Sequence, residues 1–218
     1  MIADFCLHSS LSDGRSTPAL MLAHAAALGL RAVALAEHAD GVTLERVLAD
    51  VQKVCAAYSA LVDVMVVPAV ELTGVPPACL AEEIQRARYL GARVVLVHGE
   101  GLVSGAAPGT NAAAIEGRAD ILAHPGLLSP AETQVAATLG VALELTARSG
   151  HCLANGHVWR QAQLAGAPVV VTSGAHTHGE MLGPGGLRAV ALGAGMDEDA
   201  WRASQIRSWA LACGALGV

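Results

Sequence analysis

Short runs of apolar, β-branched residues alternate with longer Ala- and Leu-rich segments along most of the chain. The short runs predict seven buried strands, at residues 2–6, 32–36, 64–72, 93–98, 120–123, 141–146 and 168–172. The longer segments predict seven helices, at residues 18–28, 44–61, 78–90, 111–117, 130–139, 156–165 and 197–213. This alternation of buried strands and helices predicts a parallel sheet joined by right-handed crossovers.

Proline and glycine mark the limits of several of these helices. The segments STPAL and SPAET place Ser or Thr before a proline, which is typical of a helix start. A glycine stands between helix and strand in ALGLRAVAL, YLGARVVLV, TLGVALEL and LAGAPVVV, where it favours a helix end. These signals support the predicted order of elements.

Polar side chains stand at or just after the C-terminal ends of the predicted strands: Glu37, His38, Glu71, His98, His124, Glu144 and His176. A closed or nearly closed barrel gathers such positions at one mouth, whereas an open doubly wound sheet would spread them along an edge. No glycine-rich nucleotide-binding motif follows the first strand. We therefore expect an α/β barrel, formed by a single domain over residues 1–218, with its site at the C-terminal ends of the strands.

Composition and charge restrict the partners. The chain has a formal net charge of −6 and no basic cluster, which argues against nucleic acid as the main partner. Its apolar stretches are interrupted well before 18 residues, and no signal peptide is visible, so neither a membrane span nor secretion is expected. The five cysteines are odd in number and widely spaced, which favours a reducing, cytoplasmic location over a disulfide framework.

The segment DFCLHSSLSDG is the first candidate for chemistry. Cys6 and His8 are two residues apart, so a strand presents both on one face, and Asp13 lies in the following turn. Each has an ordinary explanation, since a cysteine can be a buried hydrophobe, an aspartate a turn former and His38 a structural residue. Several histidines and carboxylates at one barrel mouth nevertheless predict a multinuclear site for Zn, Mn or Fe.

The ordered segments CLH, SDG, EH, VEL, VHGE, AHPG and SGAH resemble the motifs of the polymerase and histidinol phosphatase (PHP) family, from Asp4 to about Met181. The segments GVPPACL, GTNAAAI, DILAHPGLLS and ARSGHCLANGHV further resemble a subgroup of small, stand-alone PHP proteins. The resemblance implies a distorted (β/α)7 barrel with two or three divalent metal ions. It also implies hydrolysis of a small phosphorylated metabolite through a metal-bound hydroxide.

Carried over by position, the resemblance distributes eight residues over three metal positions. The first position would use Cys6, His8, Glu71 and the residue at 174; the second, Glu71, His98 and His124; the third, Asp13, His38 and His176. Glu71 would also act in catalysis as the ligand that bridges two metals.

Two departures from the family pattern fall on the first metal position. The family begins with His-x-His, where this chain has Cys6, and usually ends with Ser-Asp-Ala-His, where this chain has Gly174. Glycine supplies no ligand. We therefore expect the first metal to be absent, weakly bound, or held by a softer site that uses the thiolate.

The segment TARSGHCLANGHVW supplies the remaining catalytic candidates, Arg148, His151 and His157. Arg148 would bind a phosphate or carboxylate, and a histidine would assist the leaving group. Alternatively, Arg148 pairs with Glu144 or Glu100, and the histidines cap the following helix. Trp201 and Trp209 could form an exposed stripe on the last helix that supports a homo-oligomer.

Three functions remain open from the sequence. The leading one is a metal-dependent phosphoesterase acting on a small molecule. A second is an amide, ester or cyclic-phosphate hydrolase with an altered metal centre, since a binuclear hydroxide also attacks carbonyl carbon. A third is a non-catalytic descendant that binds a metal or ligand, because function depends on the site and not on the fold.

Overall fold

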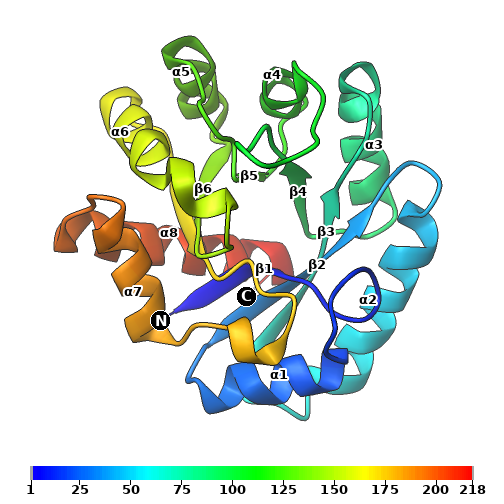
Figure 1. Ribbon diagram of the computed structural model, residues 1–218. Helices are drawn as coiled ribbons and strands as arrows, with labels where there is room; N and C mark the ends of the chain where they lie inside the picture. Colours follow the sequence, from blue (N-terminus) through cyan, green and yellow to red (C-terminus); the bar gives the residue numbers. More distant parts are fainter. Residues whose placement is uncertain (1, 218) are drawn as a thin grey trace.

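The computed structural model describes residues 2–217 and contains one seven-stranded sheet. Its strands follow one another in chain order, and every neighbouring pair is parallel (Figure 1). They are β1 (Ala3–Leu7), β2 (Ala32–Ala39), β3 (Met65–Leu72), β4 (Val94–His98), β5 (Ile121–Ala123), β6 (Ala142–Thr146) and β7 (Val169–Thr172). All seven predicted strands are present, with ends within three residues of the prediction.

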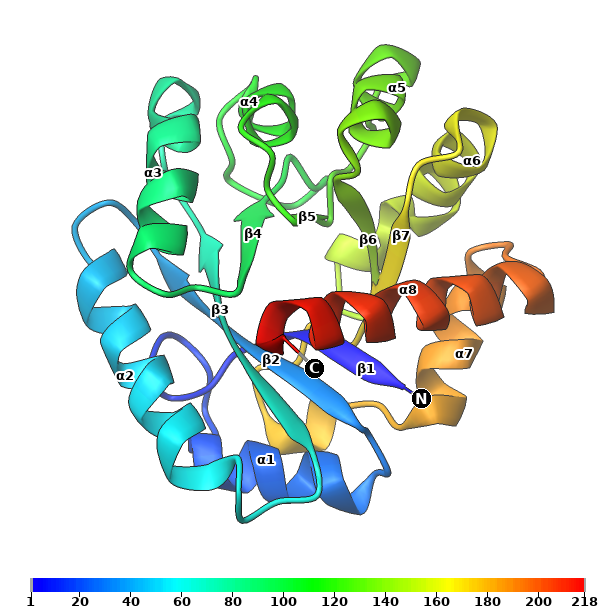
Figure 2. The ribbon, with the colours of Figure 1, turned by 180° about the vertical axis from the view of Figure 1, so that it is seen from behind.

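The helices lie outside the sheet or across one end of it. Six of them each follow a strand: α1 (Pro18–Ala27), α2 (Leu44–Tyr58), α3 (Pro77–Tyr89), α4 (Thr110–Glu116), α5 (Pro130–Leu139) and α6 (Asn155–Ala165). After β7 come α7 (Pro184–Gly193) and α8 (Glu198–Leu216), and α8 contacts β1, β2, β3 and β7 (Figure 2). Two short 3-10 helices, η1 (His151–Ala154) and η2 (His178–Glu180), lie in the loops after β6 and β7.

The sheet closes between β1 and the segment that follows β7. Leu7 and Ala175 form a parallel bridge, and the backbone N–H of His8 donates to the carbonyl of Ala175 at 2.9 Å. Nearby, the buried Asp4 carboxylate accepts hydrogen bonds from the backbone N–H and the hydroxyl of Ser173. These contacts produce a nearly closed, TIM-like (β/α)7 barrel, which confirms the predicted fold.

Alternate residues of the strands fill the barrel. A separate buried cluster contains Ala32, Ala34 and Ala36 of β2 and Val67 and Ala69 of β3, and α8 contributes to it as well. The side-chain period of a strand is two, so the next inward positions on these strands are His38 and Glu71. The inward positions that fill the core thus continue directly into the predicted site.

Two expectations about the C-terminal region were wrong or incomplete. The helix α7 was not predicted, because its first residues are Pro-Gly-Gly, which read as a turn. Trp201 is buried in the main core and Trp209 packs against the interior cluster, so they do not form an exposed stripe.

None of the helices in residues 2–217 has both the length and the hydrophobicity needed to cross a lipid bilayer.

Candidate metal centre

One pocket at the C-terminal ends of the strands collects all eight of the predicted metal ligands. Those eight side chains line it together with four other residues of the same barrel mouth: Thr146, Arg148, His151 and Gly174. The ligands come from β1, β2, β3, β4 and the loops after β1, β5 and β7. Residues that are up to 170 positions apart in the chain therefore face one another, as expected for a barrel.

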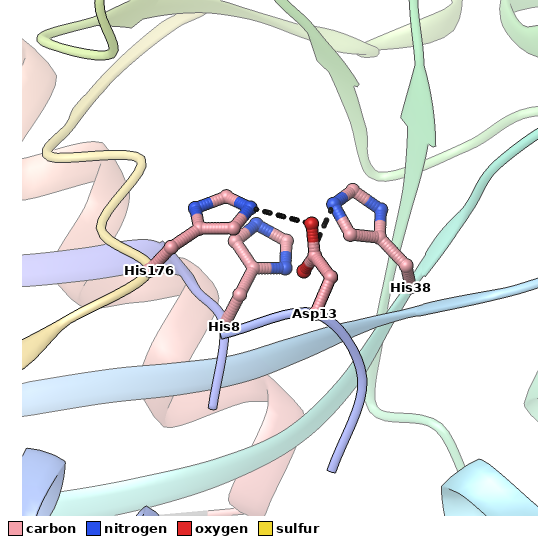
Figure 3. A group of neighbouring side chains, drawn as sticks. All are labelled: His8, Asp13, His38 and His176. Carbon is pink, nitrogen blue, oxygen red and sulfur yellow. Dashed lines mark ion pairs between the residues drawn. The ribbon is translucent and has the colours of Figure 1, made fainter. Parts of the chain in front are cut away.

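Asp13 lies among three imidazoles (Figure 3). One carboxylate oxygen is 3.2 Å from Nε2 of His176, and the other is 3.8 Å from Nε2 of His38. The ring of His8 stacks on that of His38, with centroids 4.3 Å apart and planes at 11°. Burial acts to raise the pKa of Asp13, but the hydrogen bond from His176 and the nearby imidazoles hold that pKa well below its usual value.

The outer nitrogens of two of these rings have other partners. Nδ1 of His38 lies 2.7 Å from the Thr73 hydroxyl, which itself donates to the carbonyl of Glu71. Nδ1 of His176 donates to the carbonyl of Gly174 at 3.1 Å. A proton on Nε2 of His176 can bond Asp13 in the metal-free chain. When that proton is lost, the contacts at Nδ1 hold the remaining ring proton there and leave Nε2 as a lone pair that faces Asp13. Three acceptors that face one another fit a divalent cation, which would satisfy all of them.

Glu71 lies at the centre of the pocket and is fully buried. Its Oε1 is 2.8 Å from Nδ1 of His98 and 3.9 Å from Nε2 of His124, whereas its Oε2 is 3.4 Å from Nε2 of His8. Burial acts to raise the pKa of Glu71, but His38 and the hydrogen bond from His98 keep that pKa well below its ordinary value. The two oxygens of Glu71 thus face two different sets of ligands, as a bridging carboxylate must.

His124 is held by a carboxylate that the predicted ligand set did not include. Oε2 of Glu144 accepts from the backbone N–H of His124 at 2.7 Å and from its Nδ1 at 3.0 Å. Nε2 of His124 is then left to face Nδ1 of His98, 3.0 Å away. The signal in the sequence was a glutamate inside the apolar run VALEL, where an unpartnered carboxylate would be costly.

A second buried carboxylate outside the predicted ligand set fixes the loop that carries Asp13. Glu37, at the end of β2, accepts the backbone N–H of Ser9 at 2.9 Å and the hydroxyls of Ser9 and Ser12, each at 2.5 Å. Burial raises the pKa of Glu37, although these hydrogen bonds oppose the shift. Glu37 therefore positions the β1–α1 loop and does not line the pocket itself.

The predicted catalytic residues after β6 fall into two groups. Arg148 lines the pocket and its guanidinium pairs with Glu180 at 3.4 Å, so the expected alternatives, Glu144 and Glu100, are not its partners. His151 also lines the pocket, with its ring centroid 4.2 Å from that of His124. Burial, followed by the nearby charges of His124 and His98, lowers the pKa of His151 to about 4.

His157 does not reach the pocket. Its Nε2 donates to the carbonyl of Leu128 at 2.8 Å, so the ring ties α6 to the loop after β5. A catalytic role for His157 is thus not supported by its position.

Glu100, which we considered as a partner of Arg148, instead accepts the backbone N–H groups of Gly109 and Asn111 at the start of α4.

The sequence matches an archaeal protein. The uncharacterized protein MJ1295 of Methanocaldococcus jannaschii is 32% identical over 198 residues, which cover 88% of this chain and 89% of that protein. The chain belongs to the family of MJ1295. No family model matches the chain.

Solved structures with low sequence identity share the fold. A chain of an archaeal ribonuclease P complex with mature tRNA superposes with a TM-score of 0.69 at 16% identity, covering 96% of this chain and 89% of that chain. Histidinol phosphate phosphatase (HISK) from Lactococcus lactis, complexed with zinc, L-histidinol and phosphate, gives a TM-score of 0.61 at 14% identity, covering 90% of this chain and 94% of that one. An amidohydrolase from a Sargasso Sea sample gives 0.51 at 19% identity, covering 99% of this chain and 65% of that one. These similarities establish the barrel fold.

Proposed function

We propose that this chain is a metal-dependent phosphoesterase that acts on a small phosphorylated molecule. The observation that carries the proposal is the convergence of two ligand groups in one pocket. Asp13, His38 and His176 group with His8 on one side, and Glu71 and His98 group with His38 on the other. His124 adjoins the second group, with its Nε2 3.0 Å from Nδ1 of His98. Divalent ions held there would lower the pKa of a bound water and neutralise charge on a phosphoryl oxygen.

Hydrogen bonds orient several imidazoles of the pocket so that each has one nitrogen free to bind such an ion. Second partners orient three of the imidazoles: the Thr73 hydroxyl for His38, the Glu144 carboxylate for His124 and a backbone carbonyl for His176. Partners of this kind fix the tautomer and direct the free nitrogen at the metal. The pocket is thus built around its ligands, which favours metal binding over an incidental cluster of histidines.

Arg148 is the residue that we assign to the substrate anion. It is the one arginine among the residues that line the pocket, and its partner Glu180 lies on the exposed side at 3.4 Å. A guanidinium presents two parallel N–H groups that match two oxygens of a phosphate. Arg148 would therefore exchange Glu180 for the substrate phosphate when a substrate binds.

His151 is assigned to the substrate as well. Its Nδ1 is buried and has no hydrogen-bond partner among the described residues, so it is free to bond an oxygen of the substrate or of the leaving group. The PHP-like order of motifs and the shared fold of the zinc-bound histidinol phosphate phosphatase support phosphate esters as the substrate class.

Turnover of a generic aryl phosphate tests the proposal. Full-length protein is assayed with added Zn or Mn, beside His98→Ala and the control His24→Ala, whose histidine lies on α1 and does not line the pocket. We expect metal-dependent hydrolysis that His98→Ala abolishes and His24→Ala retains. Hydrolysis of carboxylic esters or amides but not of phosphate esters would contradict the proposed substrate class. A wild-type protein that binds no metal and hydrolyses none of these substrates would contradict the proposal that the chain is an enzyme.

A further inference from the structure

Three donor atoms from β1 and β3 form a compact triangle at the base of the pocket. Sγ of Cys6 lies 3.3 Å from Nε2 of His8 and 3.5 Å from Oε2 of Glu71, and the latter two atoms are 3.4 Å apart. All three side chains are at least 98% buried. In the metal-free chain the thiol can donate to Glu71 and an Nε2–H of His8 can donate to the sulfur; a bound ion would replace both hydrogen bonds.

The dimensions of the triangle match one face of a tetrahedral metal site. Zinc bonds of about 2.0 Å to nitrogen or oxygen and about 2.3 Å to sulfur place the ligand atoms of a tetrahedron about 3.3–3.6 Å apart. All three edges of the triangle lie in this range. A single ion can therefore contact Cys6, His8 and Glu71 without movement of the backbone.

The local backbone explains how a cysteine reaches this position. The register of β1 against β2 shifts between Asp4 and Leu7, which marks a bulge or a similar irregularity, and Asp4 accepts the backbone N–H of Cys6 at 3.4 Å. Bulges redirect side chains. Cys6 consequently belongs to the interior cluster of the barrel, and its sulfur lies beside the pocket instead of under a helix.

No fourth protein ligand can be supplied from position 174. Gly174 has a φ of 59°, and a Cβ built there would lie 2.6 Å from Oγ1 of Thr146 and 2.9 Å from Cβ of Arg148. A side chain at 174 would thus collide with two neighbours and strain the backbone. Thr146 and Arg148 thus occupy the space that a side chain at position 174 would need.

We propose that Cys6, His8 and Glu71 form a thiolate-containing metal site that prefers zinc, ferrous iron or cobalt to manganese and magnesium. This inference deepens the proposed function and rests on it, since it names the class of metal for one position of the same centre. Thiolate is a soft ligand that magnesium and manganese bind poorly. The thiol proton leaves to solvent when the ion binds, because only the thiolate is a ligand.

Cobalt substitution tests the thiolate directly. Co²⁺ is titrated into metal-free, full-length protein, and the near-ultraviolet sulfur-to-cobalt charge-transfer absorption is followed. We expect the band in the wild type and in Cys152→Ser, the control cysteine in η1, and its loss in Cys6→Ser. Bound cobalt without the band, or a band that survives in Cys6→Ser, would overturn the proposal.

A measurement on the wild type alone avoids the case in which a variant loses the signal because it does not fold. X-ray absorption of the zinc-loaded wild type should include a sulfur scatterer at about 2.3 Å, the distance of a zinc–thiolate bond. A first shell of nitrogen and oxygen alone would overturn the site.

Competition between zinc and manganese gives a further test with Cys6→His. The ratio of the manganese Kd to the zinc Kd should fall by about tenfold or more in this variant, a free-energy difference of about 1.4 kcal/mol.

The two proposals fail in different ways. Hydrolysis of phosphate esters by a protein that lacks the sulfur signal would leave the function standing and overturn the thiolate site. A sulfur signal in a protein that hydrolyses no phosphate ester would retain the site and overturn the proposed function.

Discussion

Oε2 of Glu144 accepts both the backbone N–H and the ring Nδ1 of His124. His124 has a φ of 32°, an uncommon value for a residue with a side chain. The other oxygen of Glu144 accepts the Thr172 hydroxyl at 2.5 Å. Burial acts to raise the pKa of Glu144, but the hydrogen bond and the charge of His124 lower it below its usual value. This buried carboxylate thus fixes both the backbone and the ring of one metal-ligand candidate.

Glu144→Gln should weaken metal binding at the neighbouring position. Glutamine removes the negative charge that faces His124 and replaces the oxygen that faces the Thr172 hydroxyl by an N–H donor, so the ring is held less firmly and becomes a weaker ligand. Outer partners of metal-bound histidines are typically worth a factor of roughly 10–100 in affinity. Metal titration by calorimetry measures the change. Glu132→Gln, which alters only the cap of α5, is the control, and equal affinities for both variants would contradict this role of Glu144.

Metal binding should stabilise the folded chain, because the ligands converge only in the folded barrel. At a free metal concentration of about 100 times Kd, a single site adds about 2.7 kcal/mol to the free energy of unfolding. For a chain of this length that corresponds to roughly 5–10 °C in Tm. Thermal unfolding with and without chelator measures the shift. An unchanged Tm with Zn, Mn and Fe would argue against tightly held ions.

Arg148→Gln should raise KM for a phosphate ester far more than it lowers kcat. A charge-assisted hydrogen bond is worth about 1.5–3 kcal/mol, which corresponds to a rise in KM of roughly 10-fold or more. Steady-state kinetics separate the two constants. Arg188→Gln is the matched control, because that arginine pairs with Glu198 at the start of α8 and does not line the pocket. A fall in kcat with unchanged KM would contradict a role in anion binding.

Asp4 should make the metal-free protein less stable as the pH rises towards neutrality. Burial is the main cause that raises the pKa of Asp4 from 3.8 to about 7, against the lowering effect of its hydrogen bonds from Ser173 and Cys6. The folded chain therefore holds this proton between about pH 4 and pH 7 while the unfolded chain has lost it. The resulting stability is complete below about pH 4 and is lost as the pH rises through about 7, at about 1.4 kcal/mol per unit.

Comparison with Asp4→Asn isolates this contribution. Asparagine does not titrate, so chemical denaturation of the variant in chelator should show a smaller decline of the free energy of unfolding over the same pH range. Parallel curves for the two proteins would contradict the raised pKa of Asp4.

Much of the fold and the place of the site could be predicted from the sequence because both follow local rules, whereas the choice of the eight ligands came from the resemblance to the PHP motifs. Buried parallel strands are nearly continuous apolar runs, and a change from alanine to histidine at an inward position, as from Ala36 to His38, marks the end of the core. In a parallel barrel all such ends meet at one mouth. The pocket consequently contains every one of the eight expected ligands.

The features that the sequence did not predict depend on tertiary contacts. Three features have no local signature, since their partners lie far away in the chain: the register shift in β1, the bond from His157 to Leu128 and the collision at Gly174. Glu144 and Glu37 were recognisable as buried carboxylates, but their partners, a histidine backbone and a serine loop, were not. The helical pattern around Trp201 predicted a helix but did not show which face of that helix packs against the barrel, so the burial of Trp201 was missed.

An anomalous-scattering map of crystals grown with zinc tests the central claim most directly. The account predicts peaks inside the pocket at three positions: between Asp13, His38 and His176; between Glu71, His98 and His124; and beside Cys6, His8 and Glu71. Data collected on both sides of the zinc absorption edge identify the element. A pocket without anomalous density, in crystals that hold zinc elsewhere, would contradict the account.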